Sequence, residues 1–155
     1  MPDVFTKARR PEVMSRIRGR GNKATELTLA RLLRTKGITD WRRHQPVFGR
    51  PDFIFRQQRV AIFVDGCFCH GCPKYSNMPA SNRAFWMKKL TGNHTRDGLV
   101  TRTLRKDGWR VVRVWEHNLR KPTRVLARIH KALTVPKRRI GKCSPTRCFK
   151  WICFE

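Results

Sequence analysis

Two short apolar runs set the strongest limit on what this chain can fold into. Residues 51–55 (PDFIF) and 60–64 (VAIFV) are rich in β-branched and aromatic side chains, and the four residues between them suit a hairpin loop. The second run is apolar at every position, which is typical of a strand buried on both faces. We therefore expect a sheet with other elements packed on both of its sides.

Helical signals precede and follow these runs. Asn22 can cap the clearest helix, whose apolar stripe stops at Gly37, and Gly92 predicts a break in a later helical stretch. Residues 109–115 are predicted to form another strand. The order of helix, hairpin, helix, strand and helix predicts an α/β domain, with a mixed β-sheet flanked by helices. The predicted helices cover residues 11–18, 22–36, 82–90, 95–106 and a last segment around 125–133.

Net charge indicates the class of partner. The 155 residues carry 36 Lys+Arg and 10 Asp+Glu, and the formal net charge of +26 is spread over the whole chain. A domain this basic is expected to bind a polyanion, because each phosphate neutralised by Lys or Arg releases a counterion. Nucleic acid is therefore the expected partner. A hydrophobic content of 39%, with 5 Trp and 9 Phe, is enough for a modest core.

Apolar segments and cysteines indicate the compartment. No apolar stretch approaches the ~20 residues that a membrane span needs, and the first ten residues lack an apolar signal core. We therefore expect a cytoplasmic protein that is not associated with a membrane. In that compartment the 6 cysteines are expected to be thiols or metal ligands, not disulfides.

Acidic residues are few enough for candidate metal ligands to stand out. Asp52 lies at the start of one apolar run and Asp65 follows the other, and in a hairpin those two strand ends lie close together. Two carboxylates there, in a protein this basic, form a candidate binding site for a divalent cation. An Asp at a strand end also commonly caps a turn, and the residues alone leave both interpretations open.

A cluster of sulfur and nitrogen ligands follows Asp65 directly. Residues 67–72 carry the pattern C-x-C-H-x-C, in which Cys67, Cys69, His70 and Cys72 fall close together. The Cys-x4-Cys pair suits one side of a tetrahedral zinc site. Reduced thiols without metal are the alternative.

Five separated motifs, taken in order, indicate a family. They are GRPDF (49–53), IFVDGCFCHGCP (62–73), Phe85-Trp86 with Asn93 and Arg96-Asp97, GWRV (108–111) and VWE (114–116). Together they resemble the very-short-patch repair (Vsr) mismatch endonucleases, within the restriction-type PD-(D/E)xK nuclease superfamily. The resemblance covers roughly residues 4–133.

The resemblance implies a fold and a division of the chain. We expect a restriction-endonuclease-like core in a mismatch endonuclease domain over residues 1–133, whose N-terminal segment, residues 1–23, contacts DNA. Residues 134–155 have no counterpart in the family and are expected to form a basic tail that contains cysteines.

The resemblance also implies an activity and a catalytic site. Enzymes of this family depend on Mg²⁺ and nick one DNA strand beside a T:G mismatch, which starts the very-short-patch repair of deaminated 5-methylcytosine. Asp52 matches the metal-binding carboxylate, and the main-chain carbonyl of Val64 matches a second ligand. His70 matches the general base, and Asp97 matches the acid that orients it. Further catalytic-site residues of the family fall on Asp65 and Glu26.

A structural Zn²⁺ is a second metal implied by the resemblance. Its ligands map to Cys67, Cys72 and His117, and the remaining family ligand falls on Lys74 or Tyr75, neither of which binds zinc well. A chain without zinc therefore stays an alternative. Other sources of the fourth ligand are water, Cys69 and the tail cysteines Cys143, Cys148 and Cys153.

DNA recognition completes the implied site. Phe68 and Trp86 match the aromatic side chains that the family wedges beside the mismatch, and Cys69 stands where the family has a third aromatic. The residues expected to grip phosphates are Arg16, Arg18, Arg20 and Lys23.

The resemblance implies that the partner is double-stranded DNA with a T:G mismatch, with mismatch-repair proteins as further partners. It also implies a bacterial-type protein that is associated with the nucleoid. The protein is expected to act as a monomer. Two other functions fit the residues. One is a non-catalytic, zinc-stabilised DNA-binding module, and the other is a small basic RNA-binding component of a ribonucleoprotein.

Overall fold

The computed structural model of the chain describes residues 23–68, 70–74 and 82–135. Three strands form one sheet in the order β1-β2-β3, in which β1 and β2 are antiparallel and β2 and β3 are parallel. The elements are a π-helical turn η1 (Lys23–Leu27), α2 (Thr28–Thr35), β1 (Phe53–Phe55), β2 (Val60–Asp65), α3 (Arg83–Lys106), β3 (Arg110–Trp115), a 3-10 helix η2 (Glu116–Arg120) and α4 (Pro122–Thr134).

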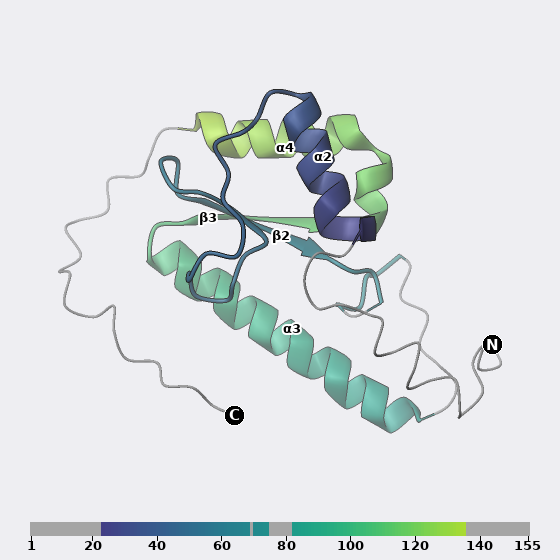
Figure 1. Cartoon of the computed structure of the whole chain (residues 1–155). Coiled ribbons are helices and arrows are strands. Elements are labelled where there is room, and N and C mark those ends of the chain that lie inside the picture. The colour runs from purple at the N-terminus through teal and green to yellow at the C-terminus, as the bar shows by residue number, and fades with distance from the viewer. Residues whose placement is uncertain (1–22, 69, 75–81, 136–155) are drawn as a thin grey trace.

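Helices cover both faces of this mixed sheet. Figure 1 shows α2 and α4 on one side of the strands and the long helix α3 on the other. The larger core lies under α2 and α4 and includes Leu29, Leu33, Val125 and Ile129. The smaller core joins the opposite face to α3 through buried residues that include Val100. The predicted α/β class, a restriction-endonuclease-like core with a mixed sheet flanked by helices, is confirmed.

Strand β2 is buried on both faces, as its continuous apolar run predicts. Val60 and Ile62 belong to the core under α2 and α4, whereas Ala61 and Phe63 belong to the core against α3. Alternation along the strand therefore puts Asp65, two residues after Phe63, on the α3 side. This placement turns the end of β2 toward the helix that carries Asp97.

The expected break at Gly92 is wrong, because α3 runs without interruption from Arg83 to Lys106. A glycine inside a helix costs only about 1 kcal/mol relative to alanine. Val100 and Leu104 are buried against the sheet and secure the second half of the helix, whereas no atom approaches a side chain built at Gly92. Packing of that half outweighs the local cost of the glycine.

Of the two helices predicted near the N-terminus, the structure describes the second. The segment after residue 22 is helical but starts with the π-helical turn η1, and it ends before Gly37, whose φ of +68° suits a glycine. The helix predicted over residues 11–18, the cap at Asn22 and the tail after residue 135 lie outside the described residues. Within the described part of the chain, no helix is long and apolar enough to span a membrane.

Candidate active site

The β1–β2 hairpin brings Asp52 against the end of β2. The main-chain N–H of Val64 donates a hydrogen bond to Oδ2 of Asp52 at 2.7 Å. Gly49, three residues before Asp52, has a φ of +75° and lies so close to Val100 of α3 that an added Cβ would clash with the Val100 side chain. The predicted proximity of the two strand ends is therefore confirmed.

The Asp52 carboxylate is destabilised in its charged form. The pKa of Asp52 is raised to about 6, mainly by burial and also by the nearby acids Glu26 and Asp65, against the lowering effect of the Val64 hydrogen bond. A desolvated carboxylate beside other acids gains most from a cation. Magnesium prefers oxygen ligands, so Asp52 beside the main chain of Val64 fits the predicted magnesium site in donor chemistry.

Glu26 lies in the turn η1 and is buried, with 5% of its surface exposed. Its Oε2 lies 2.5 Å from Nη2 of Arg43, whose guanidinium stands over the ring of Phe53 at 5.8 Å. The structure thus places Glu26 close enough to act on the pKa of Asp52 and gives it a cationic partner. Sequence reasoning missed Arg43, because the residue is in a loop without a marked pattern.

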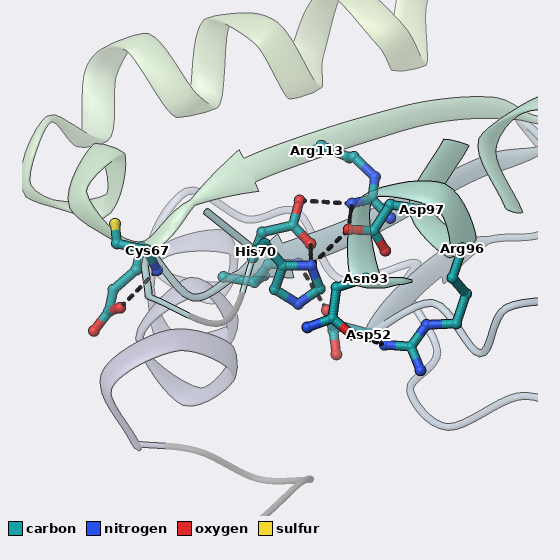
Figure 2. A network of polar contacts seen from close by, with 10 residues as sticks. Asp52, Cys67, His70, Asn93, Arg96, Asp97 and Arg113 are labelled. Atoms are coloured by element: carbon teal, nitrogen blue, oxygen red, sulfur yellow. Dashed lines mark hydrogen bonds and ion pairs between the residues drawn. The ribbon is translucent and has the colours of Figure 1, made fainter. Parts of the chain in front are cut away.

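His70 and Asp97 form a short polar contact in the site (Figure 2). Nδ1 of His70 lies 2.6 Å from Oδ2 of Asp97, which projects from α3. Burial acts to raise the pKa of Asp97, but hydrogen bonds from Arg113 and His70 outweigh that effect, so the pKa lies below its ordinary value. Asp97 is therefore ionised and accepts the proton of Nδ1, which leaves Nε2 of His70 as the basic nitrogen.

Arg113 links the two acids that face His70, and sequence reasoning missed it. Nη1 of Arg113 lies 3.0 Å from Oδ2 of Asp65 and 2.9 Å from Oδ2 of Asp97. Asp65 also faces His70, with 3.8 Å between Oδ1 and Nδ1. Burial raises the pKa of Asp65, although Arg113 and His70 act to lower it. The available signal was a single Arg inside the apolar strand run 111–115 (VVRVW).

A cavity of about 720 Å³ opens beside this cluster. His70, Asp65, Asp97 and Arg113 line one part of it, and residues of α3 that include Arg102 line another. The hollow thus combines an imidazole with arginines, a combination that suits an anionic substrate such as a phosphodiester. The open space lies where His70 could act on a bound group.

A second cluster collects the three predicted zinc ligands. Nδ1 of His117 lies 3.2 Å from Sγ of Cys67 and 3.5 Å from Sγ of Cys72, and all three ligand atoms lie within 4.8 Å of one another. Two sulfurs and one imidazole nitrogen are the donor set that zinc prefers, so these residues fit the ion. Cys69 and the tail cysteines, the other proposed ligands, lie outside the described residues.

The predicted DNA-wedging aromatics also lie together. The ring centroids of Phe68 and Trp86 are 5.0 Å apart in an edge-to-face arrangement, and Lys89 places its ammonium 5.2 Å from the Trp86 ring. The structure therefore brings the loop after β2 to the first turn of α3. Side chains of the predicted phosphate-gripping residues Arg16, Arg18, Arg20 and Lys23 lie outside the described part.

Comparison with known proteins places this site in a family. The family "DNA mismatch endonuclease Vsr" matches residues 2–76. The DNA mismatch endonuclease Vsr of Escherichia coli K12 is 39% identical over 121 residues, which cover 77% of this chain and 77% of that protein. The type II nicking enzyme V.NmeDIP of Neisseria meningitidis serogroup C is 36% identical over 124 residues, covering 78% of this chain and 82% of the relative.

A third relative matches over a shorter stretch. The type II nicking enzyme V.NaeI of Lentzea aerocolonigenes is 47% identical over 68 residues, and the match spans 44% of this chain and 41% of that enzyme. The two longer matches extend over most of the relatives and contain the motifs around Asp52, His70 and Asp97. This chain therefore belongs to the Vsr family of DNA mismatch endonucleases.

Proposed function

We propose that this protein is a Mg²⁺-dependent endonuclease that nicks one strand of duplex DNA beside a T:G mismatch, in the very-short-patch repair of deaminated 5-methylcytosine. The observation that carries this proposal is the His70–Asp97 pair, with 2.6 Å between Nδ1 and Oδ2, beside the partly buried carboxylate of Asp52. A positioned base next to a desolvated acid is the minimum that metal-assisted hydrolysis of a phosphodiester needs.

Each residue has a defined part in the proposed reaction. Asp97 holds the imidazole of His70 with its proton on Nδ1, so that Nε2 takes a proton from the attacking water. Asp52, with the main-chain carbonyl of Val64, holds Mg²⁺, which supplies Lewis-acid activation of the scissile phosphate when bound. Arg113 occupies the space between Asp65 and Asp97, which argues against a cation there and in favour of Asp52 as the magnesium ligand.

Zinc has a structural part in this proposal. Cys67, Cys72 and His117 hold Zn²⁺ and join the loop after β2 to η2, the turn that contains His117. This crosslink fixes both ends of the short loop that carries Phe68 and His70. The ion thereby stabilises the loop on which the general base and one DNA-wedging aromatic depend.

Strand nicking is supported by the names of the relatives, two of which are type II nicking enzymes. Phe68 and Trp86 form an aromatic pair that suits insertion beside a weakly stacked wobble pair. We propose action as a monomer on the bacterial chromosome, together with mismatch-repair proteins. The rival functions are a non-catalytic DNA-binding module and an RNA-binding component.

A nicking assay separates these functions. A duplex with one T:G pair is incubated with protein and Mg²⁺, and each strand carries its own label. We expect a single cut in one strand beside the mismatch, and no cut in the matched duplex or in the presence of a chelator. A shift of the DNA without any cut supports the binding module, and preference for structured RNA over duplex DNA supports the ribonucleoprotein component.

A further inference from the structure

Arg113 lies in the middle of the site and contacts both Asp65 and Asp97. Neither the family resemblance nor the proposed reaction gives this arginine a chemical role. It lies on β3, where it pairs in register with Phe63 of β2. Its guanidinium carbon stands 4.9 Å from the centroid of the Phe63 ring, which presses the cation against the sheet. The side chain keeps 25% of its surface exposed, so three quarters of it is out of water.

One nitrogen of Arg113 forms ion pairs with both carboxylates that face His70. Nη1 lies 3.0 Å from Oδ2 of Asp65 and 2.9 Å from Oδ2 of Asp97, and this same oxygen of Asp97 lies 2.6 Å from Nδ1 of His70. Figure 2 shows Arg113, Asp97 and His70 converging from β3, α3 and the loop between β2 and α3, and Asp65 is the last residue of β2. The guanidinium is therefore a direct neighbour of the atom that orients the base.

Two ionised carboxylates this close would repel each other without a cation between them. One of them would turn away, because like charges repel each other strongly in a partly buried site. Asp65 is 5% exposed and Asp97 is 16% exposed, so water screens neither fully. Loss of the Arg113 charge would therefore release Asp97 from its position against His70.

We propose that Arg113 is a positioning residue of the cutting site, which holds Asp65 and Asp97 side by side and thereby fixes the orientation and tautomer of the His70 imidazole. This role rests on the proposed function only in that His70 is taken as the general base. The backbone helps to fix Arg113, since its carbonyl accepts a hydrogen bond at 3.1 Å from Nη2 of Arg128 on α4.

A contact to DNA phosphate is the competing role for Arg113. Its Nη1 is committed to two carboxylates, and its Nε is buried without a hydrogen-bond partner among the described residues. A phosphate would have to displace Asp65 or Asp97 to reach the inner nitrogen. The geometry therefore favours an action through His70, and the two roles differ in what they change: the cutting rate or the affinity for DNA.

The test compares Arg113→Gln with Arg110→Gln, a matched control on the same strand whose guanidinium contacts the main-chain carbonyls of Gln58 and Val135. Nicking is measured in single turnover with enzyme in saturating excess, and the Kd for the same T:G duplex is measured without divalent metal. For Arg113→Gln we expect a rate lower by about ten- to a hundredfold, with the Kd within about twofold of wild type. Arg110→Gln should keep both values within about twofold.

A second readout needs no activity. Nitrogen-15 NMR of the histidine rings reports the tautomer of His70 in the neutral imidazole, and we expect Nδ1–H in wild type and a mixture of tautomers in Arg113→Gln. Arg113→Met, which keeps a contact with Phe63, replaces Arg113→Gln if that variant melts below the assay temperature. Both substitutions should act alike.

The experiments distinguish a failure of the proposed function from a failure of the positioning role of Arg113. A wild-type protein that leaves T:G duplex uncut refutes the proposed function, whereas the NMR comparison still decides the role of Arg113. An unchanged tautomer in the Arg113 variants overturns the inference. A Kd that rises in step with the loss of rate, with a flatter salt dependence, also overturns it and makes Arg113 a phosphate contact.

Discussion

His70 and Asp97 come from different elements of the fold, yet Nδ1 of the imidazole lies 2.6 Å from Oδ2 of the carboxylate. His70 lies in the turn after β2, where its main-chain N–H donates a hydrogen bond to the carbonyl of Gly66 at 3.2 Å. Asp97 lies in the middle of α3. A base held by an acid in this way keeps one tautomer and one orientation. The relationship makes the first prediction specific.

Asp97→Asn is expected to lower the single-turnover nicking rate by about a hundred- to a thousandfold, because an amide can hold the imidazole in the wrong tautomer. DNA affinity should change little, since Asp97 contacts His70 and Arg113 within the site. Quenched-flow nicking and a binding titration check the two parts. Nicking within about threefold of wild type would remove Asp97 from the mechanism.

The second prediction concerns Asp52 and the pH dependence of stability. Its pKa of about 6 lies above that of the unfolded chain, so the folded protein binds more protons between pH 4 and 6. This group therefore contributes stability that is fully present below about pH 4 and is lost as the pH rises through about 6. Asp52→Asn should abolish this pH dependence, and because it removes the buried charge it should raise the melting temperature at pH 7 without Mg²⁺ by about 2–6 °C.

Thermal unfolding of wild type and Asp52→Asn, followed from pH 4 to 8, checks this prediction. The difference between the two proteins isolates Asp52 from the other acids, which both proteins share. Mg²⁺ should raise the melting temperature of wild type and leave the variant unchanged, because a ligand stabilises only the state that binds it. A variant that melts at a lower temperature at pH 7 would contradict the assigned burial of the charge.

The ends of the hairpin could be predicted from the sequence, whereas the charge network could not. Strand alternation and a four-residue loop determine that Asp52 approaches the end of β2, and both are local properties. The contact between His70 and Asp97, 27 residues apart, was expected from the family resemblance alone. Spacing gave no geometric reason for it.

Two arginines escaped prediction because their partners are distant in sequence. Arg113 lies 48 residues from Asp65, and Arg43 lies 17 residues from Glu26. The uninterrupted α3 was missed for a related reason, since Gly92 is a local signal and the burial of Val100 and Leu104 depends on the sheet. Local rules fail here wherever packing between elements decides the outcome.

The third prediction concerns zinc. Freshly reduced protein should contain about one equivalent of zinc, and Cys67→Ser or Cys72→Ser should lose both the metal and thermal stability, because structural zinc binding is coupled to folding. Metal analysis and thermal melting check it, with Asp52→Asn as a control that should keep its zinc. Protein that holds no zinc after reduction would leave Cys67, Cys72 and His117 as an ordinary thiol cluster.

The fourth prediction separates mismatch recognition from general DNA binding. Phe68→Ala should lower the preference for T:G over matched duplex by about ten- to a hundredfold, because stacking of an aromatic on a base is worth roughly 1–3 kcal/mol. The slope of log K against log[salt] should stay unchanged, since no phosphate contact is lost. Phe48→Ala is the matched control, because Phe48 is an exposed phenylalanine, at 44%, in the loop before β1.

Substitution of Arg16, Arg18, Arg20 or Lys23 should do the opposite. Binding to all duplexes should weaken alike, and the salt slope should flatten by about one unit for each lost contact. Equal binding of matched and mismatched duplex by wild type, with no effect of Phe68→Ala, would refute recognition by the Phe68–Trp86 pair.

The most direct test of the account is the single-turnover nicking rate of wild type and Asp52→Ala on a T:G duplex with Mg²⁺. The account predicts one cut beside the mismatch by wild type and a rate at least about a thousandfold lower for Asp52→Ala, because the variant lacks a ligand of the catalytic cation. Binding of the duplex by the variant should persist. Cutting by Asp52→Ala at a rate near that of wild type would contradict the assignment of the active site.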